Sequence, residues 1–130
     1  MSKVLDYVNN LEEQAFFLYY SPYAVHSPYH AADSLLHKYV NKPVHAGQDD
    51  PDFATMIDNL DRNIGDLIAV LKEKGLYNNT LILFTTDNGG PGITKQKPLR
   101  AGKGSYYEGG IRIPILWSGL EKQRQEANQT

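Results

Sequence analysis

The sequence contains no cysteine. This absence excludes disulfide bonds, zinc–thiolate sites and any thiol or cysteine-derived nucleophile among its 130 residues. Long apolar runs are missing as well, because the longest is a handful of residues and a membrane span needs about 18. No charged and then apolar leader follows Met1, so we expect no secretory signal in these residues and no contact with a membrane.

A strong excess of charge of one sign is also missing. Thirteen basic and fifteen acidic residues give a net charge of −2. A broad nucleic-acid interface needs a strongly basic face, so we expect no nucleic-acid partner. The chain is 41% hydrophobic and 22% charged, which is typical of a globular sequence. Its length suits one modest domain or a segment of a larger one.

The clearest predicted element is a helix over residues 51–74. Asp50 is placed to cap its first turn, and Pro51 lies where a missing N–H costs nothing. Gly75 is placed to end the helix in a left-handed conformation. Gly65 interrupts it at a cost of about 1 kcal/mol relative to alanine. The apolar residues at three-and-four spacing predict one buried stripe: Phe53, Met56, Ile57, Leu60, Ile64, Leu67, Ile68 and Leu71.

Three apolar runs predict the strands of one sheet. They cover residues 14–20, 80–86 and 111–117, and short helices are expected over 4–11 and 31–40. The first two runs are apolar throughout, which favours strands buried on both faces of a parallel sheet. The order of helix, short turn and apolar strand is that of the return half of a βαβ unit. Pro114 places the third strand near an edge.

Candidate site residues follow two of these strands. Asp87 and Asn88 come directly after residue 86, and His26 lies a short loop beyond residue 20. Ligands of open α/β sheets bind beyond the carboxyl ends of the strands. Carboxylate and amide oxygens suit Ca²⁺ or Mg²⁺, although the same residues followed by two glycines also favour a simple turn. His26 could bind an anion or act as an acid, or it could be a surface residue.

Residues 89–110 hold seven of the eleven glycines and no acidic residue before Glu108. Glycines let backbone N–H groups approach an oxyanion, and lysine supplies a mobile charge, so this stretch is either an anion-binding loop or a solvated basic loop. Arg112 is placed to pair with Glu108. The four cations of the stretch are Lys95, Lys97, Arg100 and Lys103.

Several stretches together resemble the sulfatases, in family order and with family spacing over residues 1–120. Residues 121–130 are a polar tail outside the resemblance. The matching stretches are Phe16–Tyr20 with Ala24–Pro28, Met56–Asp61 with Gly75–Thr80, Phe84–Gly90, and Pro98–Pro114.

The resemblance implies an α/β fold, part of an alkaline-phosphatase-like mixed and mainly parallel sheet flanked by helices. It also implies hydrolysis of sulfate esters with a formylglycine nucleophile and a divalent cation, usually calcium. On this resemblance Asp87 and Asn88 match two metal ligands. Lys103 matches the lysine that grips the sulfate group, and His26 matches the histidine that hydrogen-bonds it.

The sequence departs from the family pattern at its nucleophile. The family motif Cys/Ser-x-Pro-x-Arg is absent, and Asp49-Asp50 precedes a helix rather than following a first strand. The other nucleophile-pocket residues and the smaller C-terminal domain of the family are absent too. We therefore expect an internal sulfatase segment that is inactive alone and whose partner is the missing remainder of the enzyme.

Two alternatives stay open at the level of sequence. One is a free-standing relic that binds anions or a partner without turnover, and the other is a phosphoester or phosphonate hydrolase of the same superfamily. The sequence identifies no particular sulfate ester. By family habit the location would be periplasmic, extracellular or lysosomal.

Overall fold

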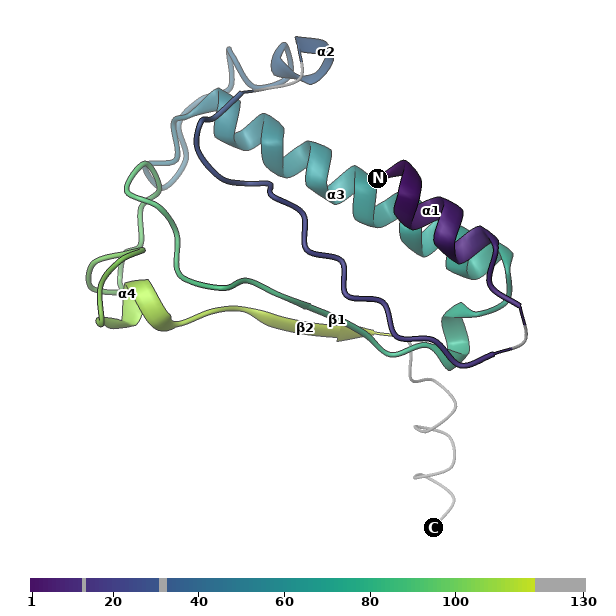
Figure 1. The fold of residues 1–130 in the computed structure, drawn as a ribbon. Helices are drawn as coiled ribbons and strands as arrows, with labels where there is room; N and C mark the ends of the chain where they lie inside the picture. The colour runs from purple at the N-terminus through teal and green to yellow at the C-terminus, as the bar shows by residue number, and fades with distance from the viewer. Residues whose placement is uncertain (13, 31–32, 119–130) are drawn as a thin grey trace, which may run out of the picture.

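The computed structural model describes residues 1–12, 14–30 and 33–118, so the predicted tail over 121–130 lies outside the described residues. Within the described part, no helix has the length and apolar character needed to cross a membrane. A long helix lies along a small sheet, with a short helix at either end of the long one (Figure 1). The elements in chain order are α1 (Ser2–Asn9), α2 (Asp33–Leu36), α3 (Pro51–Glu73), the 3₁₀ turn η1 (Tyr77–Asn79), β1 (Ile82–Thr85), α4 (Glu108–Ile111) and β2 (Ile115–Ser118).

The long helix α3 confirms the prediction for residues 51–74. The Asp50 carboxylate accepts a hydrogen bond from the Phe53 N–H at 2.7 Å and caps the first turn. At the other end Gly75 takes φ +69°, and the Leu76 N–H donates to the Leu71 carbonyl at 2.8 Å. The left-handed glycine therefore ends the helix as its sequence predicts.

The two described strands pair antiparallel, which a mixed sheet allows, and the parallel pairing predicted for residues 14–20 and 80–86 is not seen in the described part of the chain. Ile82 lies opposite Ser118 and Thr85 lies opposite Ile115. A parallel pair requires a crossover connection, usually a helix that covers the sheet. Between β1 and β2 the chain forms only loops and the single turn of α4, so it returns in the opposite direction. Both strands are also shorter than the predicted ranges 80–86 and 111–117.

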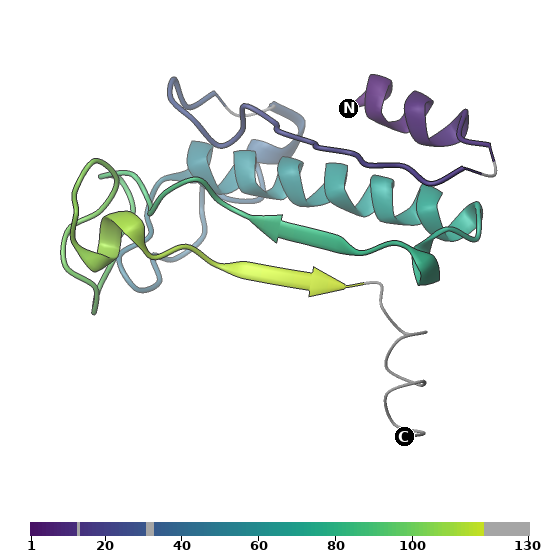
Figure 2. The same ribbon diagram turned by 60° about the horizontal axis from the view of Figure 1, so that its bottom comes forward.

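Residues 14–20 do not form the predicted strand. The segment is drawn out and runs in the direction of β1 (Figures 1 and 2), but none of its residues joins a strand ladder in the described part of the chain. Its side chains still alternate, with Phe17 and Tyr19 87% and 80% exposed and Phe16 and Leu18 half-buried. The segment is therefore extended, as its apolar composition predicts, but it forms no ladder with either described strand.

The buried side chains gather between the short helices and α3. Val8 of α1 and Leu35 of α2 are buried, as are Thr55 and Leu71 of α3. Helix α1 is shifted by two residues from the predicted range 4–11, and α2 is shorter than the predicted range 31–40. Residues 31–32 lie outside the described part. Most of the apolar stripe of α3 is only half-buried, and Ile57 is 47% exposed.

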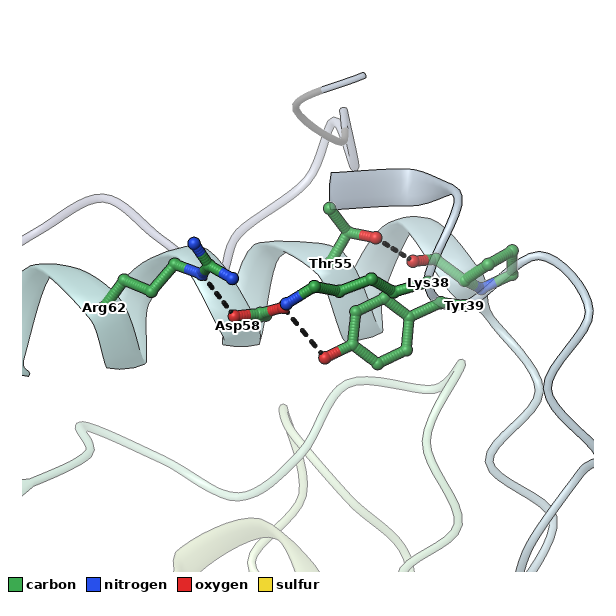
Figure 3. Close-up of polar contacts among 6 residues, drawn as sticks. Lys38, Tyr39, Thr55, Asp58 and Arg62 are labelled. Carbon is green, nitrogen blue, oxygen red and sulfur yellow. Dashed lines mark hydrogen bonds and ion pairs between the residues drawn. The ribbon is translucent and has the colours of Figure 1, made fainter. Parts of the chain in front are cut away.

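Asp58 links α3 to the turn that follows α2 (Figure 3). Its carboxylate accepts hydrogen bonds from Lys38 Nζ at 2.8 Å, from Arg62 Nε at 2.7 Å and from the Tyr39 hydroxyl at 3.1 Å. The hydrogen bond from Lys38, followed by that from Arg62, holds the pKa of Asp58 well below its usual range. The charged carboxylate therefore stabilises the folded arrangement of these two segments.

Candidate functional site

Backbone hydrogen bonds join the turn after β1 to the loop that leads to α4. The Gly89 N–H donates to the Gly110 carbonyl at 2.8 Å, and the Lys103 N–H donates to the Gly90 carbonyl at 2.9 Å. The turn carries Asp87 and Asn88 immediately before these glycines. The structure therefore brings Lys103 to the same loop pair as the two candidate metal ligands, at one end of the molecule beside α4 (Figures 1 and 2).

Glycine is required where these loops approach each other. A Cβ on Gly109 would overlap the Ala101 carbonyl, and a Cβ on Gly102 would lie 2.8 Å from the Gly90 carbonyl oxygen. The N–H groups of Gly89, Lys103, Gly109 and Gly110 all donate to loop carbonyls. These four amides are therefore engaged within the protein, whereas the Lys103 side chain is exposed.

The two candidate metal ligands differ in exposure. Asp87 is exposed, and its carboxylate has no hydrogen-bond or ion-pair partner among the described residues. Asn88 is half-buried, and its backbone carbonyl oxygen accepts a hydrogen bond from the Thr86 hydroxyl at 3.2 Å. Their oxygen donors fit calcium in kind, but calcium takes 6–8 oxygen ligands. The described residues contain no group of three acidic, histidine or cysteine side chains that could hold a metal.

Two arginines beside Lys103 are already engaged. The Arg100 guanidinium lies 3.6 Å from the centre of the Tyr107 ring, and Arg112 pairs with Glu108 at 3.5 Å, as the sequence predicts. Lys103 is exposed and has no acidic partner in the part of the chain that the structure describes. Its ammonium is therefore available to an anionic ligand.

His26 makes only local contacts in the described structure. Its Nδ1 lies 2.9 Å from the Ser27 carbonyl oxygen and 3.1 Å from the Tyr23 hydroxyl. A carbonyl can only accept, so a proton on Nδ1 donates to it and leaves Nε2 for a ligand. No hydrogen bond joins His26 to Asp87 or Lys103 among the described residues. The segment that carries His26 reaches the same end of the molecule as the loops beside α4 (Figures 1 and 2), and convergence of the three side chains stays a prediction.

One contact has no signal in the local sequence. The Gln48 side chain donates to the Lys95 carbonyl at 3.1 Å and accepts from the Lys95 N–H at 3.4 Å. Gln48 lies in a tight turn in which Ala46 and Gly47 both have positive φ. The two residues are 47 positions apart, so only the tertiary structure could reveal that this turn holds the glycine-rich loop.

Comparisons with known proteins show which family the chain is similar to. The sulfatase family model matches residues 1–130. A sulfatase of Formosa agariphila is 34% identical over 115 residues, which cover 81% of this chain and 21% of the relative. Human arylsulfatase A is 32% identical over 115 residues, which cover 83% of this chain and 21% of the relative. The solved structure of Ps i-CgsB with k-i-k-neocarrahexaose superposes with a TM-score of 0.81 at 34% identity, over 92% of this chain and 27% of that one.

These matches define a class of protein, the hydrolases of the alkaline-phosphatase-like fold. The described residues contain helices and a small sheet of that fold. The chain belongs to the sulfatase family. The resemblance seen in the sequence is thereby confirmed. The chain spans about a fifth of the length of the curated relatives.

Proposed function

We propose that this chain is a segment of a sulfatase that hydrolyses sulfate esters. In this proposal Asp87 and Asn88 contribute two ligands to a divalent cation, and Lys103 and His26 bind the sulfate group. The observation that supports the proposal is the hydrogen bond from the Lys103 N–H to the Gly90 carbonyl, which joins the Lys103 backbone to the turn that carries Asp87 and Asn88. The bound saccharide of Ps i-CgsB supports a saccharide as the group that carries the ester.

The chemistry of each residue follows from its atoms. A calcium ion held partly by Asp87 and Asn88 would supply positive charge toward the sulfate oxygens. The Lys103 ammonium donates hydrogen bonds to the same oxygens and offsets their negative charge. His26 keeps Nδ1–H on the Ser27 carbonyl, so it donates to sulfate through Nε2 only as the imidazolium.

The remaining parts of the site come, in this proposal, from the rest of a longer enzyme. No residue here opens the Cys/Ser-x-Pro-x-Arg motif, so the nucleophile lies outside these residues. Both strands expose large apolar side chains, including Leu83 at 61% and Trp117 at 73%. These surfaces suit burial against further strands and helices of the complete enzyme.

The test uses the complete enzyme, meaning the polypeptide that contains this segment and the rest of the sulfatase domain. Lys103→Ala should lower kcat on an aryl sulfate by about 100-fold or more, the usual loss for one transition-state donor. Lys3→Ala, an exposed lysine of α1, is the matched control and should leave kcat unchanged. A loss under tenfold for Lys103→Ala would refute its role. A higher kcat/KM on the matched aryl phosphate would assign a phosphoester hydrolase instead.

A further inference from the structure

Residues 91–102 form a loop whose two ends are bonded to each other. The Lys103 N–H donates to the Gly90 carbonyl at 2.9 Å, so the position of the loop and that of the Lys103 backbone are linked. Inside the loop, the turn Pro91–Thr94 is closed by a backbone hydrogen bond of 2.9 Å. Such a turn shapes the loop locally, but it does not fix the loop relative to the rest of the molecule.

One side chain from another part of the chain bonds to the middle of this loop. The Gln48 amide donates to the Lys95 carbonyl at 3.1 Å, and its oxygen accepts from the Lys95 N–H at 3.4 Å. Among the residues that the structure describes, these two hydrogen bonds are the only ones that join residues 91–99 to a segment outside the loop. Gln48 therefore fixes the middle of the loop from outside.

The turn that carries Gln48 is itself fixed to the start of α3. The Gln48 N–H donates to the His45 carbonyl at 3.0 Å, and Asp50, two residues further along, caps the helix. Gly47 has φ +76° and lies against the Lys95 stem, where a Cβ would be 2.6 Å from the Lys95 Cγ. A group supported by a rigid element is held more precisely than one on a loop alone. Gln48 therefore connects the glycine-rich loop to the long helix.

The neighbours of Lys95 extend this restraint to the end of the loop that holds Lys103. A Cβ on Gly90 would overlap the side chains of Thr94 and Gln96, so both side chains lie directly against the Gly90 backbone. The Gly90 carbonyl is in turn the acceptor for the Lys103 N–H. Contact is therefore continuous from the anchored middle of the loop to the backbone of Lys103.

We propose that Gln48 is a positioning residue for the reaction, because its two bonds to the Lys95 backbone keep the loop in the arrangement in which Lys103 reaches the sulfate group. This inference rests on the proposed function, in which Lys103 binds that group. Gln48 touches neither substrate nor metal in this proposal and acts only through Lys103. A binding group that is held loosely loses catalysis, because the reaction needs near-attack geometry.

The test is a double-mutant cycle between Gln48 and Lys103 in the complete enzyme, with kcat and KM measured on an aryl sulfate. Gln48→Ala should lower kcat about tenfold, less than the loss of about 100-fold expected for Lys103→Ala. KM should stay within about threefold, because the interaction that is lost belongs to the transition state. When Lys103→Ala is already present, adding Gln48→Ala should change kcat by no more than about twofold, because the two residues act as a unit.

The cycle separates positioning from folding. A smaller amount of folded enzyme would lower kcat by the same factor with and without Lys103, whereas loss of positioning lowers it only when Lys103 is present. Gln48→Met has a similar length without a comparable hydrogen-bonding group, so it retains packing and should lose as much activity as Gln48→Ala. Gln14→Ala is the matched control, because Gln14 is exposed and its side chain makes no hydrogen bond in the described part of the chain. It should leave kcat unchanged.

The side chain of Lys95 should matter little, since Gln48 bonds only its backbone. Lys95→Ala keeps both backbone groups and should leave kcat nearly unchanged.

Three results would overturn the role of Gln48. They are equal losses from Gln48→Ala with and without Lys103, full activity in Gln48→Met, and a loss in Gln14→Ala as large as that in Gln48→Ala. In each case a loss of about 100-fold in Lys103→Ala would leave the proposed function intact. A loss under tenfold in Lys103→Ala would instead refute the proposed role of Lys103, and this inference with it.

Discussion

The Lys103 N–H donates to the Gly90 carbonyl at 2.9 Å, and this bond joins the loop of the candidate sulfate-binding lysine to the turn after β1. Gly90 is three residues past Asp87, so the bond brings the Lys103 backbone next to the turn that carries the carboxylate. The Lys103 side chain takes no part in it and remains exposed. The bond therefore fixes the backbone of Lys103, and the exposed ammonium is accessible to a ligand.

Replacing Gly109 should disturb this arrangement. A Cβ there would overlap the carbonyls of Arg100 and Ala101, so Gly109→Ala should lower the free energy of unfolding by about 1–3 kcal/mol or more and displace the Lys103 loop. Gly65→Ala is the matched control. No atom lies within 4 Å of its added Cβ, so helix propensity should raise stability by about 0.5–1 kcal/mol. Urea denaturation of both variants measures this, and equal effects would contradict the packing argument.

The ion pairs of Asp58 should make stability depend on pH. The pKa of Asp58 is depressed in the folded state, whereas an aspartate in the unfolded chain has a pKa of about 3.9. The contribution is therefore present above about pH 4 and is lost as the pH falls through the folded-state value. Asp58→Asn should lower Tm by a few degrees at neutral pH, and the difference should shrink in acid. Asp61→Asn, on the same helix, should show no such trend. A difference for Asp58→Asn that stayed constant down to about pH 3 would be inconsistent with this interpretation.

Calcium should bind this chain alone only weakly, on the order of millimolar, because Asp87 and Asn88 provide a small part of a 6–8 oxygen shell. Calorimetry on the isolated chain measures this directly. Asp87→Ala should remove the binding heat, while Asp49→Ala, another exposed carboxylate, should not. Tight binding that survives both Asp87→Ala and Asn88→Ala would show that the ligands lie elsewhere.

The isolated chain should not hydrolyse an aryl sulfate, even with calcium present. In the proposed function Lys103 binds sulfate, but no residue of this sequence opens the nucleophile motif of the family. Water cannot replace it, because the attacking group must be held in line at near-attack distance. Without a nucleophile, Lys103 would stabilise ground state and transition state alike and lower no barrier. Turnover above the buffer blank that disappears in Lys103→Ala would reverse this conclusion.

The helix α3 and the family were both predictable from local sequence. The cap at Asp50, the proline after it and the left-handed Gly75 each act within one helical turn, so their effect does not depend on distant parts of the chain. The motif around Asp87 and the one around Lys103 identify the family by residue type and order. Their roles in the site stay predictions, because a role depends on neighbours outside these residues.

Strand pairing and loop contacts were decided by tertiary structure. The apolar run from Phe16 to Tyr20 predicts an extended backbone, but a ladder needs a partner strand, and none of the described strands pairs with it. The antiparallel return of β2 follows from the path of the loops rather than from the composition of the strand. The bonds from Lys103 to Gly90 and from Gln48 to Lys95 join residues far apart in the chain. Local periodicity carries no information about such pairs, because they form only when the folded chain brings the two segments together.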